Sequence, residues 1–151
     1  MANEAYRAVF IRIHPTGKMV LSLTTEADGH EAEYQKLLAD QLGVPALDVK
    51  VVNTDTNRFG VGHGYNTAPS PGTGPAVTSA GEKILEKARL LAGAQLTVAP
   101  ESLGWDDGAF ATTADPPEAV TIADVAMYSL SSGELPPGVE GGLDAQTVYK
   151  D

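Results

Sequence analysis

The sequence predicts an α+β fold built on a compact α/β unit, and three observations support this prediction. Short runs rich in β-branched residues alternate with stretches whose apolar residues recur at helical spacing. Glycine or proline marks most junctions between these runs, as expected for turns. The chain has 151 residues, the size of a single domain, and its 42% of hydrophobic residues suffices for a core.

The N-terminal part is predicted to be a β-hairpin followed by a helix. Residues 6–14 and 19–25 are rich in β-forming side chains, and Pro15-Thr16-Gly17-Lys18 between them has the composition of a turn. A helix over residues 30–42 would place four apolar residues on one face: Tyr34, Leu37, Leu38 and Leu42.

Local signals mark both ends of this helix. Asp28 is a candidate N-cap, and Glu31 would complete a capping box. Gly43 stands in the usual position after the last turn, with Pro45 behind it. Residues 48–53 then form a short strand, which completes a strand–helix–strand unit.

A long loop rich in glycine and proline separates this unit from the second half of the chain. It covers residues 55–75, and a loop of that length in a compact domain is usually functional or disordered. The longest helix follows over residues 76–93. A second hairpin over residues 104–113 has Asp107-Gly108 at its turn.

The C-terminal part consists of a short helix and an extended segment. The helix covers residues 121–130, with Thr121 as its cap and Asp124 at the third helical position. Residues 131–151 are rich in glycine and proline and have few apolar side chains. We therefore expect one α/β domain over residues 1–130 and a docking tail over residues 131–151.

Composition excludes several classes of partner. The net charge is −10, from 20 acidic and 10 basic residues, which argues against nucleic acid and against an anionic membrane surface. No apolar run approaches the roughly 20 residues of a membrane span, and the N-terminus does not have the pattern of a signal peptide. The chain has no cysteine, so it cannot supply thiolates to an iron–sulfur cluster. A cytoplasmic protein is expected.

No single motif in the sequence amounts to a complete active site. His30, Glu31, His63 and Asp28 could offer nitrogen and oxygen ligands, but their spacing matches no known ligand pattern, so no metal site is predicted. The glycine-rich residues 60–64 lack the lysine and hydroxyl residues of a phosphate-binding loop. A helix start and a pliable loop account for these residues more simply.

Taken in order, the motifs are more specific than any one alone. Residues 11–58 contain a strand, the turn EADGHE, a helix that ends in ADQLGVP, and the segment DVKVVNTDT. This order resembles the middle of the molybdopterin-binding large subunit of molybdenum hydroxylases, the family of xanthine dehydrogenase, aldehyde oxidase and aerobic carbon monoxide dehydrogenase. The resemblance continues through AVTSAGEKILEKARLLAG, VAPESLGWDDGAF and VTIADVA to ELPPGVEGGLDAQTVY.

The resemblance implies cofactor-binding residues in two segments. In that family, a G-Q-G turn and a later Gly-Ser-Arg loop line the dithiolene–pterin cofactor. They correspond here to seven residues: Ala27, Asp28, Gly29 and His30 in the turn, and Thr67, Ala68 and Ser70 in the loop. Asp28 stands where the family has glutamine, and Pro69 stands about where it has arginine. A carboxylate opposes an anionic pterin phosphate, and the loss of arginine removes an anion donor.

The resemblance also implies a function. It points to a small subunit of a heteromeric molybdenum hydroxylase, an oxidoreductase that adds oxygen from water to an aldehyde or heterocycle carbon. The chain would complete the molybdopterin-binding subunit and line part of the cofactor pocket. The family segment that carries the catalytic glutamate is not in the sequence, so we expect no catalysis by this chain alone. Expected partners are the rest of the molybdopterin-binding subunit, iron–sulfur and flavin (FAD) subunits, and a small-molecule substrate.

Two alternatives stay open at this point. Asp28 and Pro69 favour a non-catalytic structural or interaction subunit that no longer contacts the cofactor. His30, Glu31 and His63 would suit an independent small-molecule or metal-binding protein on the same fold.

Overall fold

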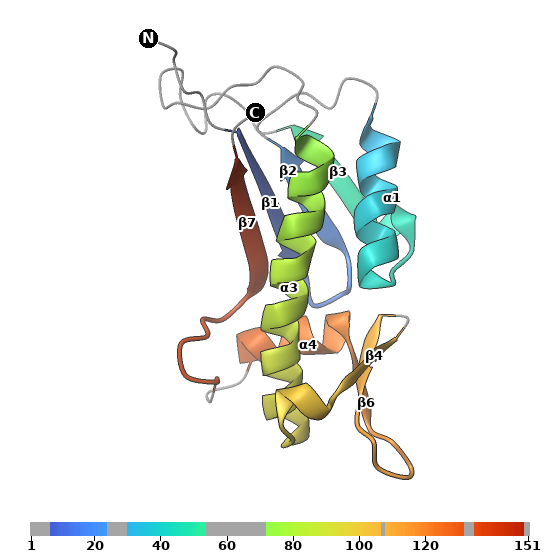
Figure 1. The fold of residues 1–151 in the computed structure, drawn as a ribbon, viewed down its shortest axis with the longest axis vertical. Helices are drawn as coiled ribbons and strands as arrows, with labels where there is room; N and C mark the ends of the chain where they lie inside the picture. The colour runs from blue at the N-terminus through green and yellow to red at the C-terminus, as the bar shows by residue number, and fades with distance from the viewer. Residues whose placement is uncertain (1–6, 24–29, 54–71, 107, 132–134, 150–151) are drawn as a thin grey trace.

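The computed structural model describes residues 7–23, 30–53, 72–106, 108–131 and 135–149. Within these ranges it contains three α-helices and two β-sheets, which confirms the predicted α+β class (Figure 1). The main sheet has four strands in the order β3-β2-β1-β7, and the small sheet has three in the order β4-β5-β6.

The main sheet is built around the predicted N-terminal hairpin. Its strands are β1 (Arg7–Ile13), β2 (Met19–Leu23), β3 (Val49–Asn53) and β7 (Leu143–Tyr149). β1 and β2 pair antiparallel, with Ile11 opposite Leu21, whereas β3 pairs parallel with β2. A parallel pair requires a crossover, and helix α1 (Glu31–Leu42) provides it.

Strand β7 lies within the segment that the sequence predicts as an extended tail. It pairs antiparallel with β1 along its whole length. The less exposed side of β7 carries Leu143, Ala145, Thr147 and Tyr149. Only two of these side chains are large and apolar, so the sequence gives only a weak strand signal. These residues belong to the main sheet, and a docking role for residues 131–151 stays a prediction.

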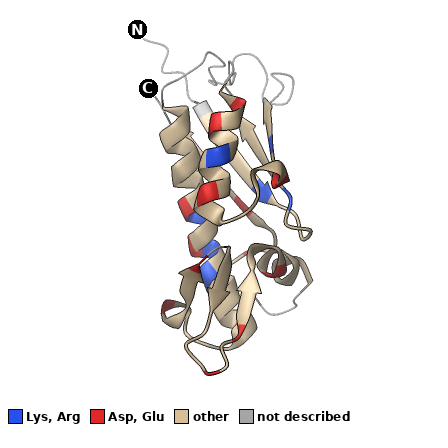
Figure 2. Ribbon diagram, turned by 90° about the vertical axis from the view of Figure 1, so that its right-hand side faces the viewer, with Lys and Arg blue, Asp and Glu red and all other residues tan. Residues whose placement is uncertain are grey.

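Helices α1 and α3 cover one face of the main sheet (Figures 1 and 2). α3 (Thr73–Leu96) extends the predicted range 76–93 at both ends. Strand residues on the covered face are fully buried: Val9, Ile11, Ile13, Leu21 and Leu23. The alternate residues Arg12, Val20 and Lys50 are exposed on the opposite face. No helix in the described ranges is long and apolar enough to cross a membrane.

The buried face of α1 differs from the prediction at one position. Leu37 is 38% exposed, and Ala39 is buried instead, while the other three predicted residues are in the core. The buried stripe of α1 contains Ala39, five residues after Tyr34, and not Leu37, three residues after it. Gly43 ends the helix with φ 66°, as predicted, and its N–H donates to Ala39 O.

The second half of the chain forms a small lobe beside the lower part of α3 (Figure 1). Its elements are β4 (Gly104–Asp106), β5 (Ala109–Ala111), β6 (Ala119–Thr121) and α4 (Ile122–Ser131). β4 and β5 form the predicted hairpin, whereas β6 was not predicted. At the start of α4, Asp124 N donates to Thr121 Oγ1 over 3.1 Å, and Thr121 N donates to Asp124 Oδ2 over 3.0 Å. This is a reciprocal cap of the predicted helix.

Arg89 of α3 joins the small lobe to the long helix. Its Nη1 donates to Leu103 O over 2.7 Å, and its guanidinium lies 5.1 Å from the ring centroid of buried Phe110. Trp105 packs on the same ring, with centroids 4.6 Å apart. A cation over an aromatic face contributes about 1 kcal/mol of stability in addition to that hydrogen bond.

Both edge strands of the main sheet have a backbone carbonyl bound by a side chain from the helix layer. Gln35 of α1 donates from Nε2 to Val49 O of β3 over 2.7 Å. Lys83 of α3 donates from Nζ to Gln146 O of β7 over 2.8 Å. These bonds tie the two helices to the edges of the sheet that they cover.

The turn of the second hairpin lies directly against the end of α1. Gly108 has φ +82°, and a Cβ on it would lie 2.5 Å from Gly43 O. Only glycine combines this backbone conformation with so close an approach.

Gly108→Ala should therefore lower the free energy of unfolding by about 2 kcal/mol or more, because overlap with Gly43 O adds to the backbone strain. Gly138→Ala is the matched control, since Gly138 has φ +78° and a Cβ on it would have no neighbouring atom within 4 Å. It should cost about 1 kcal/mol. Denaturant unfolding of both variants measures the difference, and equal losses would contradict a role for the contact with Gly43.

Candidate functional site

The candidate site lies at the edge of the main sheet where β2 and β3 end. Both parallel strands run toward this edge, and α1 and α3 begin there (Figure 1). Ligands of open α/β sheets bind outside the carboxyl ends of the strands, beside helix N-termini with free N–H groups. The topology thus makes this edge the natural binding position.

In the sequence, the two predicted cofactor segments fall between the end of β2 and the start of α1 and between the end of β3 and the start of α3. Six of the seven predicted residues lie outside the described residues: Ala27, Asp28, Gly29, Thr67, Ala68 and Ser70. Their roles stay predictions. His30 is the one predicted residue whose position is described.

His30 is the N-cap residue of α1. Its side chain makes no cap hydrogen bond and instead its Nδ1 lies 2.9 Å from Glu33 Oε2, one turn into the helix. Both side chains are more than half exposed, so this contact contributes little stability. The structure thus places His30, rather than Asp28, at the cap position of α1, and Asp28 lies outside the described residues.

Three hydroxyl groups meet just inside the edge. Thr73, the first residue of α3, is 1% exposed, and its Oγ1 lies 2.7 Å from the hydroxyl of Tyr149 at the end of β7. Thr73 also hydrogen-bonds Tyr34 of α1. The cluster therefore joins α1, α3 and β7 at the point where the second predicted cofactor segment enters α3.

The sequence does not predict the hydroxyl cluster. It predicts Tyr34 on the buried face of α1, but it predicts a loop at Thr73 and a tail at Tyr149. Only the pairing of β7 with β1 brings Tyr149 to α3. A pairing across so many residues has no local sequence signal.

The two helix starts at this edge differ in charge. The first turn of α3 has no acidic residue, whereas the first turn of α1 has Glu31 and Glu33. Helix N-termini favour anions, and nearby carboxylates oppose them. An anionic group therefore fits the start of α3 better than the start of α1.

A metal centre built from this chain alone is not present in the described residues, which contain no group of three His, Asp or Glu side chains suited to hold an ion. The alternative of an independent metal-binding protein also uses His63, which lies outside those residues. That alternative stays open.

Similarity to known proteins shows the family of this chain. Residues 1–151 match the family model of the molybdopterin cofactor-binding domain. The chain belongs to this family. The resemblance inferred from the sequence motifs is thereby confirmed, and so is the class of cofactor.

The molybdopterin-binding chain also has named relatives. It is 36% identical over 143 residues to the carbon monoxide dehydrogenase large chain of Afipia carboxidovorans, which covers 92% of this chain and 17% of that one. It is 26% identical to the nicotine 6-hydroxylase large subunit of Paenarthrobacter nicotinovorans, over 89% of this chain and 17% of that one. The chain thus spans about a sixth of the length of these relatives.

The fold of the molybdopterin-binding chain is found in solved structures as well. Reconstituted carbon monoxide dehydrogenase from Oligotropha carboxidovorans superposes with a TM-score of 0.81 at 30% identity, over 97% of this chain and 18% of that one. The fold of nearly all of this chain is therefore found within about a fifth of that solved chain.

Tyr34 gives this edge a measurable property. Burial raises its pKa above the ordinary 10.0, the hydrogen bond to Thr73 lowers it in part, and the charge of Glu33 raises it again. Because the pKa is higher in the folded state, ionisation favours unfolding. The stability from neutral Tyr34 is complete below pH 10.0 and is lost as the pH rises through the folded-state pKa.

Thr73→Val should raise the pKa of Tyr34 further and lower the free energy of unfolding by about 1–3 kcal/mol, since Tyr149 loses its partner. Tyrosinate absorbance during alkaline titration, with Tyr34→Phe to assign the signal, measures the pKa. Thr78→Val, at an exposed position of the same helix, is the control. Identical titrations of both threonine variants would contradict the proposed coupling.

Proposed function

We propose that this chain contributes one segment of the molybdopterin-binding large subunit of a molybdenum hydroxylase and lines part of its cofactor pocket. The match of the whole chain to the molybdopterin cofactor-binding domain is the observation that carries the proposal. The relatives that support it are named large chain or large subunit, and each is about six times longer.

Two short segments would hold the cofactor. By resemblance they are residues 27–30, before α1, and Thr67, Ala68 and Ser70, before α3. When bound, the cofactor supplies the redox chemistry that adds oxygen from water to a substrate carbon. This chain would position one side of the cofactor and exclude water there, and we assign it no catalytic residue.

Electrostatics favour the α3 side of the edge for the anionic part of the cofactor. The first turn of α3 is free of carboxylates, and the buried Thr73 fixes the start of the helix through its hydroxyl contacts. Glu31, Glu33 and Asp28 would instead oppose an anion at the start of α1.

The partners follow from the cofactor chemistry. Electrons must leave the cofactor, and a chain without cysteine cannot hold iron–sulfur clusters through thiolates. We therefore propose that iron–sulfur and flavin centres are on other chains. The substrate would be a small molecule with an oxidisable aldehyde or heterocycle carbon, and the cytoplasm stays the predicted location.

A structural or interaction subunit that does not touch the cofactor is the second candidate. It is favoured by Asp28 and Pro69 in place of the family residues, and by the two glutamates that begin α1. The two candidates differ in one measurable respect, the dependence of molybdenum content on residues 27–30.

Gly29→Val should lower the molybdenum content of the purified complex about tenfold or more if the turn lines the pocket, because a branched side chain prevents close backbone approach. Gly104→Val is the matched control, since Gly104 lies on exposed β4 and its nearest neighbour atom to an added Cβ is 3.9 Å away. Metal analysis of each assembled complex is the measurement. Full molybdenum content in an assembled Gly29→Val complex would favour the structural subunit.

A further inference from the structure

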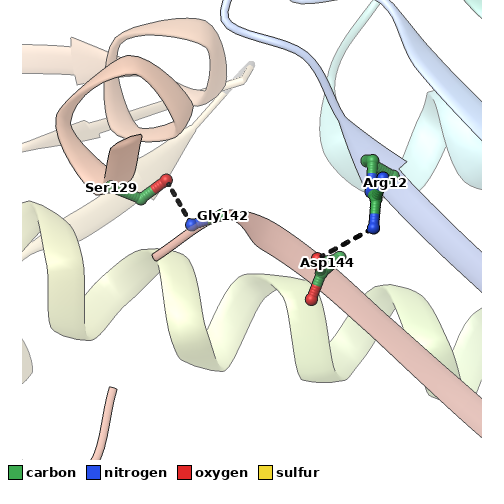
Figure 3. A network of polar contacts seen from close by, with 4 residues as sticks. All are labelled: Arg12, Ser129, Gly142 and Asp144. Carbon is green, nitrogen blue, oxygen red and sulfur yellow. Dashed lines mark hydrogen bonds and ion pairs between the residues drawn. The ribbon is translucent and has the colours of Figure 1, made fainter. Parts of the chain in front are cut away.

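A groove of about 690 Å³ lies at the end of the main sheet opposite the cofactor edge. It is bounded by the turn between β1 and β2, the beginning of β3, the end of α4 and the beginning of β7. Figure 3 shows two polar contacts at this end of the molecule. We call this surface the basic groove, and the side chains that matter most in it are Arg12, Lys18, Val20, Leu47, Lys50 and Leu130.

The groove gathers exposed apolar side chains from separate elements. Leu47 is 94% exposed, Leu130 is 60% exposed and Val20 is 39% exposed. They come from the short 3₁₀ helix before β3 (Ala46–Asp48), from the end of α4 and from β2. Large apolar side chains are commonly exposed singly, but three that converge on one groove mark an interaction site.

The charge of the groove opposes that of the chain. Three cationic side chains line it, those of Arg12, Lys18 and Lys50, against two carboxylates, those of Asp48 and Asp144, in a chain of net charge −10. Arg12 Nη2 lies 3.8 Å from Asp144 Oδ2 (Figure 3), and the Arg12 side chain is 80% exposed. An ion pair with this distance and exposure is weak, so Arg12 can still bind another anion.

The walls of the groove are held in place without an occupant. Ser129 of α4 is 2% exposed, and Gly142 N donates to its Oγ over 3.2 Å, which fixes the start of β7 on α4 (Figure 3). Across the groove, His14 N donates to Lys18 O over 2.8 Å and closes the turn between β1 and β2. A preformed surface loses little entropy when a partner binds.

We infer that the basic groove binds an extended protein segment with acidic and leucine-type side chains, supplied by another chain of the molybdenum-containing complex. The inference rests on the proposed function. Leu47, Leu130 and Val20 would bury apolar side chains of that segment, and the three cations would pair with its carboxylates. A leucine rim so widely exposed suits a polypeptide better than a small molecule, which binds where most of its surface becomes enclosed.

The test is zero-length carbodiimide coupling of lysine amines to carboxylates in the purified complex, read by mass spectrometry and accompanied by metal analysis. We expect Lys18 and Lys50 to couple to Asp or Glu residues of a different chain, within a segment that also contains leucine. Lys36, which pairs with Asp40 on the exposed side of α1, is the internal comparison and should couple within this chain.

A pair of variants tests the apolar part of the groove. Leu47→Asp should weaken the binding of this chain to its partner about tenfold. The new carboxylate would compete with the partner's carboxylates for the cations of the groove, and an apolar contact would be lost. Leu90→Asp, on α3 at a position 44% exposed, is the matched control and should assemble normally. Circular dichroism of each free chain verifies that both variants fold.

The outcomes separate this inference from the function on which it rests. A complex with molybdenum in which Lys18 and Lys50 do not couple to another chain, or in which Leu47→Asp assembles like Leu90→Asp, overturns the inference and leaves the proposed function intact. Coupling between two copies of this chain also overturns it. A chain that purifies alone and without molybdenum overturns both.

Discussion

The burial of one face of α3 is the interaction on which the rest of the structure depends. Its stripe consists largely of small side chains, which let the helix approach its neighbours closely: Ala76, Ala80, Gly81, Ala88 and Ala92. Ile84 and Leu91 are fully buried along the same stripe, and each contributes about 1.5–3 kcal/mol of hydrophobic stabilisation. In the view of Figure 1, the upper half of α3 packs on β1, β7 and α1, and its lower half packs on α4 and the small lobe. One helix thus holds both sheets in place.

This arrangement gives the two ends of the main sheet different chemistry. At one end β2 and β3 end, and α1 and α3 begin. The first turn of α3 has no carboxylate, and buried hydroxyl groups lie beside it. At the other end the same strands begin beside exposed leucines and cations. The function proposed above would use both ends, one as a binding edge and the other as a surface for a neighbouring polypeptide.

The elements that can be predicted from the sequence are those encoded by neighbouring residues. The hairpin, α1, α3 and the cap of α4 follow from turn residues, apolar spacing and capping pairs that lie close together along the chain. β7 and the Thr73–Tyr149 contact could not be predicted in this way, because they depend on residues that meet only after folding. The basic groove escaped for the same reason, since Lys18, Lys50 and Leu130 come from three distant segments. The cofactor class came from the order of motifs, which spans most of the chain.

The side chains that bind the edge carbonyls of the main sheet also bear on how the isolated chain behaves in solution. A free edge strand offers unpaired backbone groups to any other strand, and such edges promote aggregation. Gln35 occupies Val49 O on one edge, and Lys83 places a charge at Gln146 O on the other. An incoming strand would have to displace the bond at the edge to which it adds before it could extend the sheet. The two bonds would in this way oppose self-association of the isolated chain through the edges of its main sheet.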